Sequence, residues 1–243
     1  SVVTPNKVAC SSDFDHYLHL KKTATKYQAR FLFETNVGAG LPVISTLSDL
    51  LKSGDRIYKI QAVLSGTLNF LFNEYDGSTK FSDIVKRAKE EGYTEPDPRI
   101  DLSGVDVMRK ILILARESGY KMELDEIENR PFVPEECMET DSIEAFYEKL
   151  DEYDHVFKEI VDSAAKEGKR VKYVATMDHG KASSGLETYG PEHPFYELAG
   201  KDNIVLFQTQ RYPEQPLVVK GAGAGAAVTA SGIFADVMRI TSA

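Results

Sequence analysis

The chain has 243 residues, of which 42% are hydrophobic and 28% charged, and this composition is typical of a globular protein with a substantial core. The formal net charge of −9 argues against general nucleic-acid binding and against attachment to anionic membrane surfaces. No run of about 18 apolar residues is present, so no transmembrane helix is predicted. The chain contains two cysteines, too few for a disulfide framework, which indicates reduced thiols and a cytoplasmic location.

Short strands and helices alternate near the start of the chain. The apolar run 29–35 predicts a buried strand, and the alternating run 55–64 predicts another. Between them, 42–54 is expected to be a helix with Pro42 at its first position and Gly54 just beyond its end. The expected elements before these are a β-branched segment at 1–7 and a helix at 11–28.

The middle of the chain is predicted to be helical. A helix at 81–92 is expected to take Ser82 as its N-terminal cap. The segment 101–119 has the strongest helical pattern. The acidic, lysine-rich residues 141–167 continue the helical block, with a break expected near Asp151.

Strand patterns return after this block and are separated by turn signals that suit a mostly antiparallel sheet. The predicted strands are 170–176, 184–189, 203–209 and 216–220. Because strands occur both before and after the helical block, the block is interpreted as an insertion into a β-containing domain, which makes the fold class α+β.

The segment "GAGAGAAVTASG" at 221–232 looks like a dinucleotide-binding loop between a strand and a helix. Such a loop normally opens a βαβ unit, with an acidic residue about 20 positions further on. Only three residues follow the predicted helix at 231–240, so no second strand and no acidic ribose ligand can follow. The segment is therefore not a complete nucleotide-binding fingerprint.

The densest group of polar residues is "EEGYTEPDPRIDLSGVDVMRKILIL". Glu95, Asp97 and Asp101 are expected in a Pro-rich loop, and Asp106 and Lys110 are spaced i, i+4 on the next helix. A solvated loop and a surface ion pair are the common explanation of this pattern. The functional alternative is a desolvated lysine that serves as acid and base, beside loop carboxylates that hold a cationic amine. The turn "NVGAGLP" at 36–42 is likewise either an ordinary tight turn or a nest around an ion.

Five segments resemble the homoserine dehydrogenase family and occur in its order and spacing. They are "TPNK" at 4–7, "ETNVGAGLPVI" at 34–44, "LSGTLNF" at 64–70, "GYTEPDPRIDLSGVDVMRK" at 92–110 and "GAGAGAAVTASGIFAD" at 221–236. They span essentially the whole chain, and the pattern is similar to the short, fungal-type enzymes without a regulatory domain.

The resemblance implies a division of the chain into four regions. Residues 1–41 would be the C-terminal remnant of a Rossmann-type nucleotide-binding domain, whose front with its own GxGxxG is absent here. Residues 42–63 and 170–220 would form a mixed or antiparallel dimerisation sheet, and 64–169 an inserted helical catalytic region. Residues 221–243 would return to the nucleotide-binding domain, so that "GAGAG" closes the hinge beside the cofactor.

The reaction implied by the resemblance is the reversible NAD(P)-dependent interconversion of L-homoserine and L-aspartate 4-semialdehyde, in the biosynthesis of threonine, methionine and isoleucine. Similarity assigns proton transfer to Lys110 and places Lys7 near the nicotinamide and the substrate. The implied substrate-binding residues are Glu95, which would hold the homoserine ammonium, and Asp106, Tyr93, Thr67 and Gly66. The implied cofactor-binding residues are Lys7, Gly92 and Gly225.

The resemblance also implies a monovalent cation, sodium, held mostly by backbone oxygens at Glu34, Val37, Ala39 and Leu41. A homodimer is expected, with no nucleic-acid partner and no membrane. The chain alone is expected to lack activity without a nucleotide-binding domain. The alternative is a non-catalytic dimeric α+β module that keeps the substrate pocket but cannot bind the cofactor.

Overall fold

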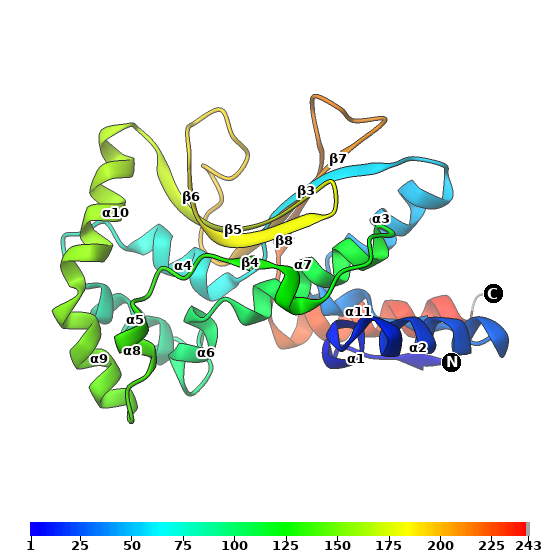
Figure 1. Cartoon of the computed structure of the whole chain (residues 1–243), viewed down its shortest axis with the longest axis horizontal. Coiled ribbons are helices and arrows are strands. Elements are labelled where there is room, and N and C mark those ends of the chain that lie inside the picture. The colour runs from blue at the N-terminus through cyan, green and yellow to red at the C-terminus, as the bar shows by residue number, and fades with distance from the viewer. Residues whose placement is uncertain (242–243) are drawn as a thin grey trace.

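The computed structural model describes residues 1–241, which form one curved sheet with helices packed mainly on one of its faces (Figure 1). A smaller group of elements from the two ends of the chain lies below one end of this sheet in the same view. Among the described residues, no helix is both long and apolar enough to cross a membrane.

The elements follow the predicted order closely. The strands are β1 (Val2–Val3), β2 (Phe31–Leu32), β3 (Ile57–Val63), β4 (Glu128–Asn129), β5 (Arg170–Asp178), β6 (Lys181–Tyr189), β7 (Asp202–Thr209) and β8 (Leu217–Ala222). The helices are α1 (Val8–Ser11), α2 (Phe14–Lys26), α3 (Val43–Lys52), α4 (Gly66–Glu74), α5 (Phe81–Glu90), α6 (Pro98–Leu102), α7 (Val105–Glu117), α8 (Glu135–Met138), α9 (Ile143–Glu152), α10 (Asp154–Lys166) and α11 (Ala226–Thr241). Short 3-10 turns occupy Glu34–Asn36 and Leu124–Glu126.

The main sheet has the strand order β4-β6-β5-β3-β7-β8. β3 precedes the helical block in sequence yet lies between β5 and β7, which follow it, and both pairings are antiparallel. Only the short β4 is parallel to its neighbour in this described sheet. The predicted α+β class and the mostly antiparallel sheet are therefore confirmed.

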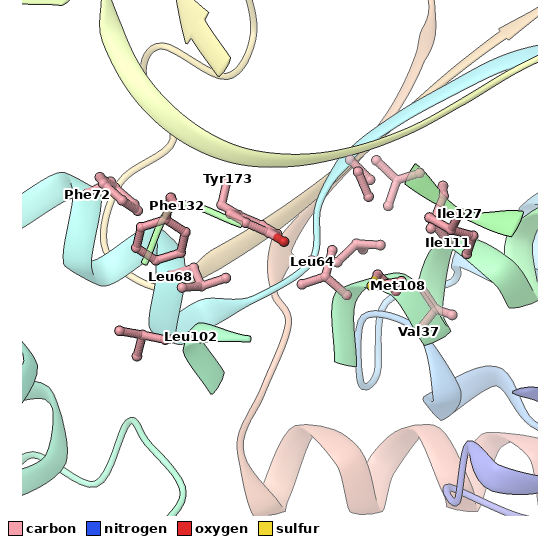
Figure 2. Close-up of a cluster of buried hydrophobic side chains, with 14 of the residues drawn as sticks. Val37, Leu64, Leu68, Phe72, Leu102, Met108, Ile111, Ile127, Phe132 and Tyr173 are labelled. Atoms are coloured by element: carbon pink, nitrogen blue, oxygen red, sulfur yellow. The ribbon is translucent and has the colours of Figure 1, made fainter. Parts of the chain in front are cut away.

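A hydrophobic core fills the space between the sheet and the helices. In Figure 2, Leu68 and Phe72 of α4 lie near Phe132 and Tyr173, while Met108 and Ile111 of α7 gather with Ile127. These side chains belong to one continuous cluster of buried residues. Burial of this apolar surface fixes α4 and α7 against the sheet, and these two helices carry the polar residues considered below.

The second face of the sheet is covered by loops instead of helices (Figure 1). Phe195 and Leu198, from the connection between β6 and β7, pack there against Val63 and Val174 in a small separate cluster. Elsewhere on this face lie half-buried polar side chains such as Gln61, and also Val218 of β8, which pairs with Leu206 and is 44% exposed.

The smaller group of elements contains β1 and β2, paired in parallel, with α1, α2 and α11 around them. The buried carboxylate of Asp236 on α11 accepts a hydrogen bond from the backbone N–H of Glu34 at 2.9 Å. The C-terminal helix is thereby tied to the segment that follows β2, almost the whole length of the chain away in sequence.

Several local predictions were wrong in detail. Pro42 is the N-cap of α3 and not its first residue, and α11 begins at Ala226, inside the predicted glycine loop. The helix predicted at 101–119 is divided at Gly104, which has a φ of +73°. Ser82 does not cap α5, whose N-cap is Lys80, because its hydroxyl donates to Asp151 of α9 instead. The strand predicted at 29–35 is reduced to the two residues of β2.

Candidate active site

Two adjoining hollows lie where the N-termini of α4 and α7 meet the segment before α11. One hollow of ≈ 620 Å³ contains Lys7 and Glu95 in its lining. The other, of ≈ 260 Å³, contains Lys110. Ser65, Asp101 and Asp106 line both hollows, so the two form one continuous candidate site.

Asp106 lies between two lysines. Its Oδ2 is 2.9 Å from Nζ of Lys110, one helical turn along α7, and its Oδ1 is 3.3 Å from Nζ of Lys7. The Lys110 ammonium also donates to the carbonyl oxygen of Leu64 at 2.7 Å, and only 13% of its side chain is exposed. The pair predicted from the i, i+4 spacing is therefore partly enclosed and is not an ordinary surface ion pair.

The close packing of Gly104 fixes the start of α7. A Cβ placed on Gly104 would lie 2.0 Å from the Tyr173 hydroxyl oxygen, well inside van der Waals contact. The left-handed φ of +73° also favours glycine here. The absence of a side chain lets α7 approach β5 closely, and this approach sets the positions of Asp106 and Lys110.

Thr67, Tyr93, Asp101 and Glu95 form a second polar group beside the lysines. The Thr67 hydroxyl donates to the carbonyl oxygen of Tyr93 and lies 3.2 Å from Oδ1 of Asp101. The other Asp101 oxygen accepts from the backbone N–H of Glu95 at 2.8 Å. Asp101 thus connects the first turn of α4 to the loop that carries Glu95.

Burial and neighbouring charges shift the pKa values of the site residues in different directions. Burial lowers the pKa of Lys110, although the charge of Asp106 acts against this shift. Burial acts to raise the pKa of Asp106, but the charges of Lys110 and Lys7 outweigh it and hold the pKa below its ordinary value. Burial raises the pKa of Asp101, and the nearby carboxylates of Glu95 and Asp106 reinforce the rise. Such divergence between neighbouring groups is characteristic of acid–base sites.

Gly92 and Gly225 border the smaller hollow. A Cβ added at either glycine would meet no described atom within 4 Å, so open space adjoins the backbone at both positions. A ligand could therefore approach the backbone closely there. Gly225 comes directly before α11, whose first-turn N–H groups have no intrahelical acceptors.

The loop predicted to hold a cation lies apart from both hollows. The Glu34 carboxylate accepts from the N–H groups of Ile44 at 2.6 Å and Ser45 at 3.0 Å, and lies 3.1 Å from Arg239. In residues 1–241, no group of three or more His, Cys, Asp or Glu side chains is arranged to hold a metal ion.

The structure brings together the residues predicted to bind substrate and cofactor. These are Lys7, Gly66, Thr67, Gly92, Tyr93, Glu95, Asp106, Lys110 and Gly225. Glu34, Val37, Ala39 and Leu41 line neither hollow.

The sequence alone did not distinguish the roles of Asp97 and Asp101, which both follow Glu95. Asp97 pairs with Arg99 at 2.7 Å and caps α6, which accounts for its charge structurally. Asp101 belongs to α6 and not to the loop, and it lines both hollows. Lys201 also lines the smaller hollow but gave no local signal, because its proximity to Gly66 arises only in the folded chain.

A model of the family described as "Homoserine dehydrogenase" matches residues 42–238. The chain belongs to the homoserine dehydrogenase family. A homoserine dehydrogenase from Schizosaccharomyces pombe is 44% identical over 100% of this chain and 66% of its own length. The chloroplastic bifunctional aspartokinase/homoserine dehydrogenase 2 of Arabidopsis thaliana is 49% identical over 99% of the chain, which spans only 26% of that protein.

Solved structures share the fold of this chain. A protein of unknown function from Candida auris superposes with a TM-score of 0.94 at 42% identity, covering 100% of this chain and 70% of its own. A hyperthermophilic archaeal homoserine dehydrogenase in complex with NADPH gives a TM-score of 0.75 at 27% identity, over 99% of this chain and 63% of its own. The chain thus spans about a quarter of the plant relatives and about two thirds of the fungal one.

Proposed function

We propose that this chain supplies the substrate-binding and proton-transfer parts of an NAD(P)-dependent homoserine dehydrogenase. The reaction would interconvert L-homoserine and L-aspartate 4-semialdehyde. The observation that carries the proposal is the enclosed Lys110 ammonium beside Asp106, in a site where Asp101 and Glu95 form no ion pair within residues 1–241. Membership of the homoserine dehydrogenase family supports the choice of substrate.

Lys110 would transfer the proton of the substrate hydroxyl. The Leu64 carbonyl and the Asp106 carboxylate take two of its three N–H directions, which leaves the third for the substrate oxygen. In the oxidation of homoserine, the neutral amine accepts the hydroxyl proton as hydride leaves the carbon. In the reverse reaction the ammonium returns that proton to the aldehyde oxygen. The lowered pKa of Lys110 makes its neutral form accessible.

Glu95 would bind the ammonium of homoserine, with Asp101 beside it. Asp106 would hold Lys110 in position and contact the substrate, while Gly66, Thr67 and Tyr93 border the smaller hollow. Lys7 adds positive charge near Asp106 and would adjoin both the substrate and the nicotinamide.

The nicotinamide supplies the hydride acceptor or donor when NAD(P) is bound. The open space at Gly92 and Gly225 fits a nucleotide in this position, and the first-turn N–H groups of α11 could bind its phosphates. A further domain would have to supply most of the nucleotide site. Exposed apolar residues support such a neighbour, since Phe234 of α11 is 64% exposed and Val8 is 61% exposed.

Sodium binding at the loop around Glu34 is part of the proposal. The Glu34 carboxylate is already engaged by two N–H groups and Arg239. An ion would therefore be held by the backbone oxygens of Glu34, Val37, Ala39 and Leu41. This donor set suits a hard monovalent cation better than a transition metal.

We also propose a homodimer, formed through the sheet face that loops cover, and a cytoplasmic location. Pairing through this face would cover the half-buried polar side chains that no described helix shields. The two buried cysteines are not paired, which suits a reducing compartment. The supply of homoserine to threonine, methionine and isoleucine biosynthesis belongs to the same proposal.

The test is an assay of the full-length protein that contains this chain. Reduction of NAD+ or NADP+ should require L-homoserine. L-2-Aminobutyrate, which has the same carbon skeleton without the hydroxyl, should support no reduction with either nucleotide. Absence of homoserine-dependent reduction would overturn the proposed function.

A further inference from the structure

We propose that Lys201 binds the α-carboxylate of the amino-acid substrate, an assignment that rests on the function proposed above. Lys201 lies in the turn that leads into β7 and borders the smaller hollow together with Thr67, Tyr93 and Lys110. Its Nζ is 4.5 Å from the centre of the Tyr93 ring.

Of the two lysines that line the smaller hollow, Lys201 is the one without an ion pair in the described residues, whereas the larger hollow has Arg109 as a further cation without one. Lys7 and Lys110 both lie within ion-pair distance of Asp106, so their charges are partly balanced inside the protein. In the part of the chain that the structure describes, Lys201 has no carboxylate within 4.0 Å and makes only the cation–π contact with Tyr93. A carboxylate ligand would provide a stronger, charge-assisted partner than the ring.

The carboxylates show the opposite arrangement. Asp101 lies 3.2 Å from the Thr67 hydroxyl and accepts from the N–H of Glu95, but within residues 1–241 neither Asp101 nor Glu95 forms an ion pair. The site therefore offers unpaired negative charge on one part of its lining and an unpaired ammonium on another. An α-amino acid carries the complementary pair, since its ammonium suits Glu95 and its carboxylate suits Lys201.

The backbone around Lys201 is held firmly against α4. The Gly200 carbonyl accepts from the side-chain amides of Asn69 and Asn73, each at 3.0 Å. The preceding Leu198 carbonyl accepts from the fully buried ammonium of Lys172 at 2.8 Å. This anchoring fixes where the Lys201 side chain begins.

The same anchoring brings Lys201 next to the first residue of α4. A Cβ added at Gly66 would lie 3.1 Å from the Lys201 carbonyl oxygen, so the two backbones are in close contact. Only the side chain of Lys201 remains exposed and free to move to a ligand. A fixed backbone that carries a free ammonium is well suited to select substrates by their carboxylate.

The test compares Lys201→Met and Lys201→Arg in the full-length protein. Methionine keeps the length and removes the charge, so KM for homoserine should rise about 10–100-fold, the usual effect of losing a charge-assisted contact. KM for the nucleotide should not change, and arginine should restore most of the affinity for homoserine. Competitive inhibition by L-2-aminobutyrate, which retains the carboxylate, should weaken by the same factor as homoserine binding.

Lys181→Met is the matched control, because Lys181 is an exposed lysine at the start of β6 and borders neither hollow. An unchanged KM for homoserine in Lys201→Met would overturn the assignment. So would a rise in the nucleotide KM alone, which would indicate a phosphate ligand for Lys201. If the parent enzyme is active and either of these results is obtained, the assignment of Lys201 fails but the proposed dehydrogenase function stands. An inactive parent enzyme would overturn both the assignment and the proposed function.

Discussion

The Lys110 ammonium lies 2.9 Å from the carboxylate of Asp106, one turn earlier on the same helix. Burial favours the neutral form of Lys110 and lowers its pKa, whereas the negative charge of Asp106 favours the charged form. The balance between these two effects determines the pH range in which Lys110 can accept a proton.

Lys110→Ala should lower kcat for homoserine oxidation in the full-length protein by about 10²–10⁴-fold, because the proton-transfer group is lost. Homoserine affinity, measured by calorimetry, should change only a few fold. Lys7→Ala is the comparison, since Lys7 shares Asp106 but makes no contact with the Leu64 carbonyl. Near-normal turnover in Lys110→Ala would remove the proton-transfer role.

The two directions of the reaction should respond oppositely to pH. Oxidation needs neutral Lys110, so its kcat should rise as the pH increases through the pKa of Lys110. Reduction needs the ammonium and should slow over the same range. That pKa lies below the ordinary value for lysine because burial disfavours the charged form.

Asp106→Asn should move both pH profiles toward acid, since the carboxylate that stabilises the Lys110 ammonium is removed. Full pH profiles of kcat in each direction, compared with the parent enzyme, would measure the shift. A profile that moves toward alkaline pH would contradict the coupling between Asp106 and Lys110.

Much of the fold and part of the site could be predicted from sequence because they depend on local patterns. The alternation of β3 and the strand patterns between turn signals of β5 to β8 were clear, and the i, i+4 spacing placed Asp106 and Lys110 on one helical face. The family resemblance placed Lys7 and Asp106 each near the substrate, but it did not predict the ion pair between these two residues, which are 99 positions apart.

Some features of the site depend on tertiary contacts and could not be predicted from local sequence patterns. Asp97 and Asp101 look equivalent in sequence, yet Arg99 pairs with Asp97, while Thr67 from another helix contacts Asp101. The division between α6 and α7 at Gly104 is also tertiary in origin, because the Tyr173 hydroxyl occupies the place where a side chain would lie. Neither contact produces a pattern in the sequence from which it could be predicted.

Glu95→Gln should act mainly on substrate affinity in the full-length protein. Glutamine keeps the size but loses the charge that would meet the homoserine ammonium, a contact usually worth about 1.5–3 kcal/mol. KM for homoserine should rise far more than KM for the nucleotide. Asp97→Asn is the matched control, because Asp97 pairs with Arg99 and lines neither hollow. Equal effects of Glu95→Gln on both KM values would point to a structural role of the loop.

Gly104→Ala should destabilise the chain by about 1–3 kcal/mol, from the left-handed backbone and from overpacking. The new Cβ would lie 2.0 Å from the Tyr173 hydroxyl oxygen. Tyr173→Phe in the same chain should recover part of the loss, since it removes that oxygen. Urea unfolding of the two single variants and the double variant would give the coupling. Additive losses would show that the clash with Tyr173 is not the cause.

The 243-residue chain on its own should form a homodimer that neither binds NAD(P) tightly nor oxidises homoserine. The main sheet, with β3 near its centre, is formed within the described residues, and one of its faces has loops but no helix packed on it (Figure 1). The nucleotide site is different, because the described residues offer the proposed cofactor little beyond Lys7, Gly92 and the glycine segment that ends at Gly225. Light scattering should therefore give about twice the 27.0 kDa mass of one chain. Titration with NADPH should show no saturation across the range of about 1 μM–1 mM in which complete enzymes usually saturate. A monomeric mass would remove the dimer proposal, and saturable NADPH binding would show that this chain holds the nucleotide without a further domain.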